Sequence, residues 1–212
     1  MQKIKIWSVL LSNPERLRIF TSKMHNPSED SLPANQAGSE LAGELATGNL
    51  AVSDAYVMQG DTLCEHLETL SPNSPIRDAY NYWLSLSNNG RVPTRQSIDP
   101  TAISVETVPH IVLIDVEYGP EQRFRYRLVG TGVTRIFGAD YTGNYLDEMD
   151  QGQVFGRIQA FYSLVCKDQQ PSMLYGSYLA KSGIAFDVAR LVMPLSDDGN
   201  RVDALFCIVE RT

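Results

Sequence analysis

IVLIDVEYGPEQRFRYRLVGTGVTRIFGADYTG, at positions 111–143, carries the clearest structural pattern of the chain. Within it, RFRYRLVG (123–130) alternates aromatic and leucine side chains with arginines. This two-residue period is typical of a strand with one buried face and one solvent-exposed face. Gly119-Pro120 interrupts the β-branched run before it, which favours a turn with a loop of about five residues. The stretch therefore predicts a hairpin of two strands, near 111–117 and 124–130.

A helix is predicted before this hairpin. Ser74 and Pro75 form an N-cap followed by proline at the first helical position, and apolar residues then recur at helical spacing. Asn88-Asn89-Gly90 ends the segment, as glycine and asparagine commonly end helices. The residues Ser74–Asn89 are therefore expected to form an amphipathic helix.

A second N-cap and proline pair, Asp99-Pro100, predicts another short helix. Pro109 disfavours helical geometry in the residue before it, so this helix should stop near Val108.

The chain after the hairpin predicts two more helices and three strands. A short helix over Thr131–Phe137 is closed by Gly138, and helical spacing of apolar residues predicts a longer helix over 153–167. The remaining strand patterns lie near 172–180, 185–195 and 202–210. The last of these is apolar on both faces, so we expect it at the centre of the sheet.

This element order predicts an α+β fold: a five-stranded antiparallel sheet with helices on one face, preceded by an N-terminal helix. The predicted domain covers residues 74–212. Residues 1–73 are expected to form a largely flexible extension, since 26–48 is rich in Ser, Pro, Asn, Gly and Ala and poor in large apolar side chains.

Composition excludes several classes of protein. A net charge of −7 over 212 residues argues against general binding to nucleic acid. The chain contains no apolar run long enough for a membrane helix and no signal peptide with a cleavage site, so we expect a soluble, cytoplasmic protein. Membrane contact is not expected, although residues 3–20 form a basic, partly apolar segment that would suit an anionic surface.

Several short motifs together resemble one known family. They are the pair Tyr82-Trp83, the stretch RVPTR at 91–95 with Ile98-Asp99-Pro100, RFRYRLVGT at 123–131, GADYTG at 138–143 and MPLS at 193–196. This combination resembles a family of small bacterial PAS-like proteins, mainly alphaproteobacterial and formerly of unknown function. The resemblance covers roughly residues 74–212.

The resemblance implies a PAS-like fold and a sensory or adaptor role without established enzymatic activity. PAS domains commonly bind a small molecule between sheet and helices, or bind a partner protein. The aromatic side chains near the two later helices, together with an arginine of a later strand, are the candidates for lining such a cavity: Tyr126, Tyr141, Tyr145, Phe161, Tyr162 and Arg190. The cofactor is unknown, and the domain could also have none.

The arginines of the hairpin have two interpretations. Arg125 and Arg127 lie opposite the apolar face and would be solvated or paired with acids on a neighbouring strand. Alternatively, together with Arg190, they would offer guanidinium groups to a carboxylate or phosphate.

Gly130-Thr131-Gly132 follows a strand and opens a helix, as in a dinucleotide-binding fingerprint, but Arg135 stands where the third glycine is expected. A tight turn into the helix is the favoured interpretation. The acidic group Asp147, Glu148 and Asp150 is interpreted as helix capping in preference to acid–base catalysis.

Metal and redox sites are not expected. His25, His66 and His110 are scattered, which argues against a metal site and against haem. Cys64, Cys166 and Cys207 are also far apart, fit no disulfide or zinc pattern, and should be reduced thiols. The cysteine context of a flavin photosensor is not found.

These observations favour a non-enzymatic sensory or adaptor protein of bacterial signalling, acting through dimerisation or contact with a partner such as a histidine kinase. The contact element would be the Ser74–Asn89 helix, with Tyr82 and Trp83 exposed on it. The alternative is a ligand-gated sensor that binds a metabolite, nucleotide or fatty acid between helices and sheet. The third hypothesis is an enzyme of unrecognised type.

Overall fold

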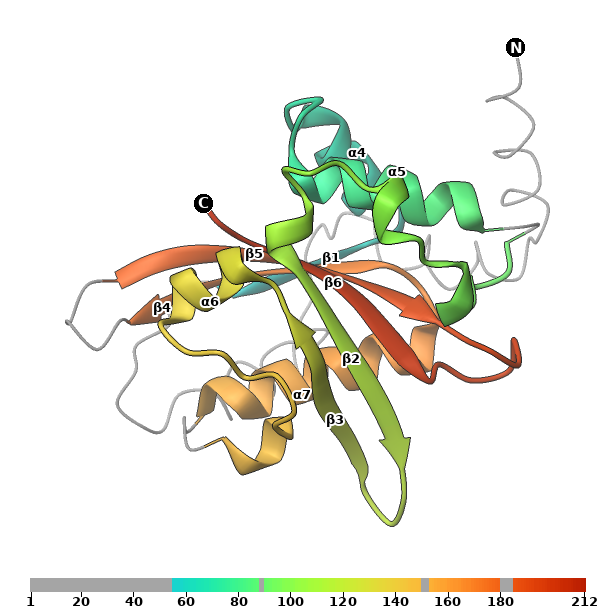
Figure 1. The fold of residues 1–212 in the computed structure, drawn as a ribbon, viewed down its shortest axis with the longest axis vertical. Helices are drawn as coiled ribbons and strands as arrows, with labels where there is room; N and C mark the ends of the chain where they lie inside the picture. The colour runs from blue at the N-terminus through green and yellow to red at the C-terminus, as the bar shows by residue number, and fades with distance from the viewer. Residues whose placement is uncertain (1–54, 88–89, 150–152, 180–184) are drawn as a thin grey trace, which may run out of the picture. The chain divides into compact units, whose positions relative to one another are not determined.

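The computed structural model describes residues 55–87, 90–149, 153–179 and 185–212 (Figure 1). The strands are β1 Tyr56–Gln59, β2 Ile111–Tyr118, β3 Gln122–Val129, β4 Ser172–Leu179, β5 Ala185–Leu195 and β6 Ala204–Arg211. The α-helices are α4 Gly60–Thr69, α5 Pro75–Leu86, α6 Thr131–Phe137 and α7 Gln153–Asp168. Short 3-10 turns lie at Arg95–Ser97, Pro100–Ala102, Val108–His110 and Leu146–Glu148.

The strands form one antiparallel sheet in the order β1-β4-β5-β6-β2-β3. The predicted α+β class and the five strands are confirmed, and β1 adds a sixth strand at the edge. β6 lies between β5 and β2, as its two apolar faces predicted. Successive residues of β6 point into opposite cores, because side chains alternate across a strand.

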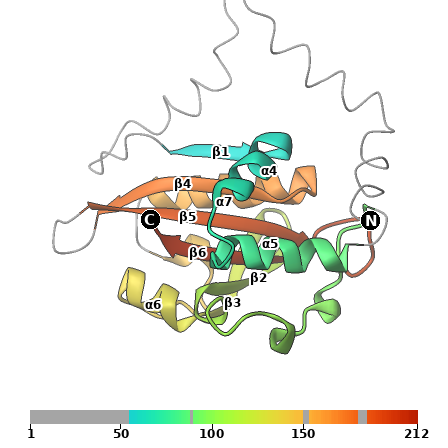
Figure 2. The same ribbon diagram turned by 90° about the horizontal axis from the view of Figure 1, so that it is seen from above.

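Helices cover both faces of this sheet. Figure 1 shows α4 and α5 on one side of the sheet and α7 on the other, and Figure 2 views the sheet from the side of α4 and α5. The core under α6 and α7 includes Phe124, Ile158 and Tyr162, whereas the core under α4 and α5 includes Trp83 and Phe206. The sequence predicted α5 as a helix before the sheet and placed the sheet's helices on one face. The structure adds α4 and places it with α5 on the second face.

Part of the predicted N-terminal extension is built into this sheet. Residues 55–73 contain β1, which pairs with β4, and α4, whose Leu63 and Leu67 are buried. The segments 3–20 and 26–48 lie outside the described residues.

The prediction of one short helix from Pro100 to Val108 is wrong. Asp99 does cap the chain, because its carboxylate accepts the Thr101 amide at 2.9 Å, but only a 3-10 turn follows. Beyond it, Asp78 of α5 accepts hydrogen bonds from the Ser104 amide at 3.3 Å and the Thr107 hydroxyl at 2.8 Å. The Ser104 amide is thus bonded to another helix, and the Thr107 amide closes a turn on the Ser104 carbonyl at 3.0 Å, so no continuous helical ladder forms.

The hairpin differs from its prediction in two details. The loop between β2 and β3 is Gly119–Glu121, shorter than expected, and the strand register shifts between Leu113 and Ile114. Arg127 is the extra residue of this bulge. Leu128 was expected on the buried face with Tyr126, but beyond the bulge it is 43% exposed, so that expectation is wrong.

The Gly130-Thr131-Gly132 turn is a point of close backbone approach. A Cβ on Gly130 would lie 2.3 Å from the carbonyl oxygen of Pro109, and one on Gly132 would lie 2.9 Å from the same oxygen. Gly138 ends α6 with φ 72°, as predicted. The glycines thus serve helix–sheet packing and not a dinucleotide motif, whose strands would pair in parallel.

Candidate functional site

A cavity of about 30 Å³ lies between the sheet and helices α6 and α7. Apolar side chains form most of its wall, tyrosine rings form the rest, and one residue is charged. The lining residues are Val112, Tyr126, Val129, Val133, Phe137, Tyr141, Met149, Phe155, Ile158, Tyr162, Tyr178, Arg190 and Val209.

Arg190 is the charged residue of this cavity. It lies in the middle of β5, which is otherwise apolar from Val188 to Leu195, and only 4% of it is exposed. One terminal nitrogen donates to the Tyr162 hydroxyl at 2.7 Å. The Nε–H is buried and has no hydrogen-bond partner among the described residues.

The groups around Arg190 are neutral at ordinary pH. Burial raises the pKa of the Tyr126 and Tyr162 hydroxyls and raises that of the Cys207 thiol to about 12. The ion pairs formed among the described residues involve arginines 95, 123, 125 and 127, and Arg190 takes part in none of them. Its guanidinium therefore keeps a positive charge that these residues leave uncompensated.

The face of α7 decides which of its aromatic residues reach the cavity. Phe155, Ile158 and Tyr162 follow one another at helical spacing and line it. Phe161 was a candidate lining residue, but it points about 100° away around the helix, as geometry requires for a neighbour of Tyr162. It is buried in the same core without lining the cavity.

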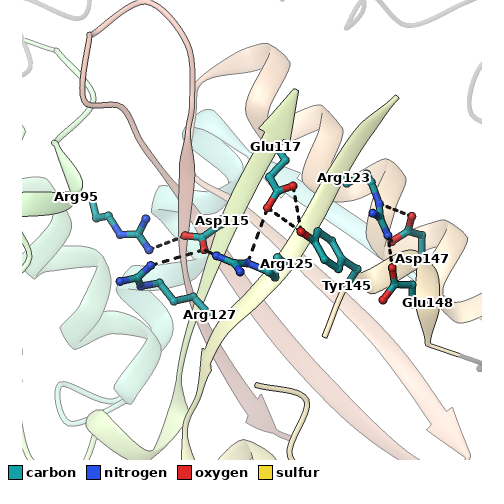
Figure 3. A network of polar contacts seen from close by, with 9 residues as sticks. All are labelled: Arg95, Asp115, Glu117, Arg123, Arg125, Arg127, Tyr145, Asp147 and Glu148. Atoms are coloured by element: carbon teal, nitrogen blue, oxygen red, sulfur yellow. Dashed lines mark hydrogen bonds and ion pairs between the residues drawn. The ribbon is translucent and has the colours of Figure 1, made fainter. Parts of the chain in front are cut away.

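Of the other candidates, Tyr126, Tyr141, Tyr162 and Arg190 line the cavity, whereas Tyr145 does not. Tyr145 bridges to Arg125 at the outer edge of β3, and its hydroxyl donates to the two Glu117 oxygens at 3.0 and 3.1 Å (Figure 3). The Arg123 guanidinium lies over its ring, 3.9 Å from the centroid. This network keeps the Tyr145 ring at the surface.

Arg123 also fixes the acidic group that precedes α7. It donates to both oxygens of Asp147, at 2.7 and 2.9 Å, and to Glu148 at 2.6 Å (Figure 3). These carboxylates join the 3-10 turn to β3. Asp150, the third member of the predicted capping group, lies outside the described residues.

Asp115 of β2 is the centre of a second group of arginines (Figure 3). Arg95 donates to one of its oxygens at 2.6 Å and Arg125 to the other at 2.9 Å, while Arg127 lies at 3.8 Å. Partial burial opposes ionisation, but the hydrogen bonds from Arg125 and Arg95 outweigh it and lower the pKa of Asp115. The predicted pairing of the hairpin arginines with acids is thus confirmed, and Arg190 does not join them.

The two residues proposed for partner contact lie on α5. Trp83 was expected to be exposed, but only 6% of it is, and its indole N–H donates to the Pro194 carbonyl at 2.9 Å. Tyr82 is half-buried, its ring meets Phe206 edge-on, and its hydroxyl accepts the Asp99 amide at 2.6 Å. The expectation of an exposed Trp83 is wrong, because the sheet buries this face of α5.

Sequence reasoning missed several lining residues. Tyr178 of β4 packs against Phe137, with ring centroids 5.3 Å apart. Both would have been accessible to sequence reasoning, since Phe137 ends a predicted helix and Tyr178 lies in a predicted strand. What the sequence did not show is which face each side chain takes.

The histidines and cysteines show no ligand-like grouping. His110 Nδ1 lies 3.0 Å from the Val209 carbonyl oxygen, and burial raises the pKa of the Cys166 thiol to about 12. Over the described ranges, no cluster of His, Cys, Asp and Glu is placed to hold a metal ion. Nor does any helix in these ranges have the length and apolar character needed to cross a membrane.

Comparison with known proteins identifies a family. A family model described as a PAS domain matches residues 72–209. Eleven chains of known structure match. One of them, titled "Structure of an RNA-binding Light-Oxygen-Voltage Receptor", is 14% identical with a TM-score of 0.40; the match covers 87% of this chain and 45% of that one. No curated protein matches.

Proposed function

This chain belongs to the PAS-domain family, and on that premise we propose that it is a non-enzymatic sensory protein that binds a small molecule in the cavity beneath α6 and α7. The observation that carries this proposal is the convergence of Arg190 and tyrosine hydroxyls on an apolar cavity. Apolar walls with a few convergent polar groups are typical of small-molecule sites.

The size of the cavity implies that binding moves its wall. About 30 Å³ accommodates roughly two water molecules, so a larger ligand must displace a lining side chain. Met149 is the suitable one, because it is only partly buried and its thioether chain is flexible.

Movement at Met149 would be transmitted to β3. The segment before it is bonded to that strand: the Gly143 amide donates to the Tyr126 carbonyl at 2.6 Å, and the Tyr126 amide to the Asn144 carbonyl at 2.9 Å. Binding would therefore bias the edge of the sheet through backbone hydrogen bonds. The signal then passes by contact with another protein, a second copy of this chain or a partner such as a histidine kinase.

Native and denaturing mass spectrometry of the full chain, purified without added ligand, test this proposal. The expected result is a mass excess in the native spectrum that disappears on denaturation. Val133→Leu should reduce the liganded fraction, because Val133 lines the cavity and the added methylene fills part of it. Val105→Leu is the matched control, since Val105 is 76% exposed.

Two results would contradict the proposal. One is an unliganded native spectrum combined with a melting temperature that no member of a small-molecule panel raises, because a ligand of the native state must stabilise it. The other is a bound mass that Val133→Leu and Val105→Leu leave equally unchanged.

A further inference from the structure

We infer that the cavity binds a monocarboxylate with a compact apolar body, whose carboxylate accepts hydrogen bonds from the guanidinium of Arg190. This inference rests on the proposed function and adds the chemical class of the ligand. It is carried by the charge, the free donors and the walls of the cavity.

The charge of Arg190 points to an anion. A buried cation is costly unless it is paired, and natural proteins seldom bury an arginine without an acid. The described residues around Arg190 supply hydroxyl and thiol groups and no carboxylate. Water in the cavity would satisfy hydrogen bonds but would not compensate the charge.

The free donors point to a carboxylate. A guanidinium has five N–H donors, and the Tyr162 hydroxyl takes one of them. The Nε–H is buried without a partner among the described residues, although it belongs to the planar fork that binds carboxylates with two parallel hydrogen bonds. A planar carboxylate therefore matches both the charge and the unused donor.

The walls exclude more highly charged ligands. Arg190 is the one charged group among the described lining residues, and the rest of the wall is largely aliphatic and aromatic, including Val129, Phe155 and Ile158. A phosphate dianion or a nucleotide would bring a second negative charge and further acceptors into these apolar surroundings. A single carboxylate on an apolar body leaves no charge unpaired.

The test is a titration of the full chain with matched acids and amides at neutral pH. Binding is measured by the melting temperature of the protein and by calorimetry. The probes are benzoate, butanoate and hexanoate, with benzamide, butanamide and hexanamide as neutral counterparts and inorganic phosphate as the competing anion. We expect at least one carboxylate to raise the melting temperature and to bind at least about tenfold more tightly than its amide.

Variants of Arg190 test whether this residue causes the preference for acids over amides. Arg190→Met removes the charge at similar length and should abolish the preference for acid over amide, while Arg190→Lys keeps the charge without the fork and should retain part of it. Arg127→Met is the matched control: Arg127 is 56% exposed outside the cavity, so its loss should leave the preference unchanged. If Arg190→Met does not fold, the Lys variant still tests the site, since it must weaken the acid preference.

The outcomes separate this inference from the proposed function. Equal binding of acids and amides overturns the inference and leaves the sensor intact, as does phosphate binding more tightly than every carboxylate. Failure of all the probes, while the native spectrum still shows a bound mass lost in Val133→Leu, also overturns the inference alone. Failure of all the probes with no bound mass overturns both.

Discussion

Two arginine environments in this domain differ in how they are compensated. Arg125 shares Asp115 with Arg95 at a partly exposed surface, where the carboxylate and solvent spread the charge. Arg190 is buried beneath α7 with a tyrosine hydroxyl as its hydrogen-bond acceptor. The Arg125 arrangement stabilises the fold. The unpaired charge of Arg190 destabilises the ligand-free fold, and a bound anion would offset that destabilisation.

Arg190→Met should therefore stabilise the ligand-free protein, by about 1 kcal/mol, because replacing an uncompensated buried charge with a well-packed apolar side chain is often favourable. Urea denaturation of protein refolded without small molecules measures this. Arg190→Ala is the control and should lower stability, because it leaves a larger cavity. A large loss of stability in the Met variant would instead make Arg190 a structural residue.

Asp115→Asn should destabilise the domain in a pH-dependent way. The folded-state pKa of Asp115 is lowered, so its contribution is present above the unfolded pKa of about 3.9 and is lost as the pH falls through the folded value. We expect the variant to be less stable by about 2 kcal/mol at neutral pH and the difference to shrink in acid. Urea titrations at a series of pH values test this, and a difference that stays constant into acid would contradict it.

At the scale of elements, prediction succeeded where the signal was local. The α5 start at Pro75 and the α6 end at Gly138 follow from caps that the sequence displays directly. The strand β1 was missed, since its four residues are recognisable only through pairing with β4, more than a hundred residues later. The bulge at Arg127 has no local signal either, which is why Leu128 was assigned to the wrong face.

In the candidate site too, features with a local sequence signal were predictable and features set by tertiary contacts were not. Aromatic residues near the helices and the lone arginine of β5 could be picked from the sequence, since a charge within an apolar strand is conspicuous. Whether Tyr145 or Phe161 reaches the cavity depends on edge pairing and helix rotation, and both are set by tertiary contacts.

Gly130→Ala should strongly destabilise the junction of β3 and α6. Its Cβ would lie 2.3 Å from the Pro109 carbonyl oxygen, a backbone atom that cannot move without shifting the chain. We expect a loss of about 3 kcal/mol. Gly156→Ala is a control of opposite sign, because this glycine lies within α7 with open space at its Cβ, and alanine should stabilise the helix by about 1 kcal/mol. Thermal melts of both variants measure these changes in stability. Similar losses of stability in the two variants would contradict the packing argument.

At the scale of the whole molecule, the second layer of helices extends the ordered core beyond the matched family segment. The match begins at residue 72, yet Met58, Leu63 and Leu67 are buried against the same sheet. β1 and α4 therefore contribute to the core that α5 completes.

A chain that begins at residue 74 should be markedly less stable than one that begins at residue 55. It loses the burial of Met58, Leu63 and Leu67, worth about 6 kcal/mol together at roughly 2 kcal/mol for each side chain. Chemical denaturation of the two truncated chains measures this difference, and binding of a hydrophobic dye should rise in the shorter one. Equal stabilities would show that β1 and α4 pack only weakly on the sheet.

The position of β6 has a consequence for the order in which the molecule can assemble. β6 follows every other described strand along the chain, yet it separates β5 from β2 in the sheet. The hairpin of β2 and β3 and the pair of β4 and β5 can each form during synthesis, but they cannot be joined until β6 has left the ribosome. Until then both pairs expose unpaired edges, a period in which nascent chains are prone to aggregate and chaperones are most needed.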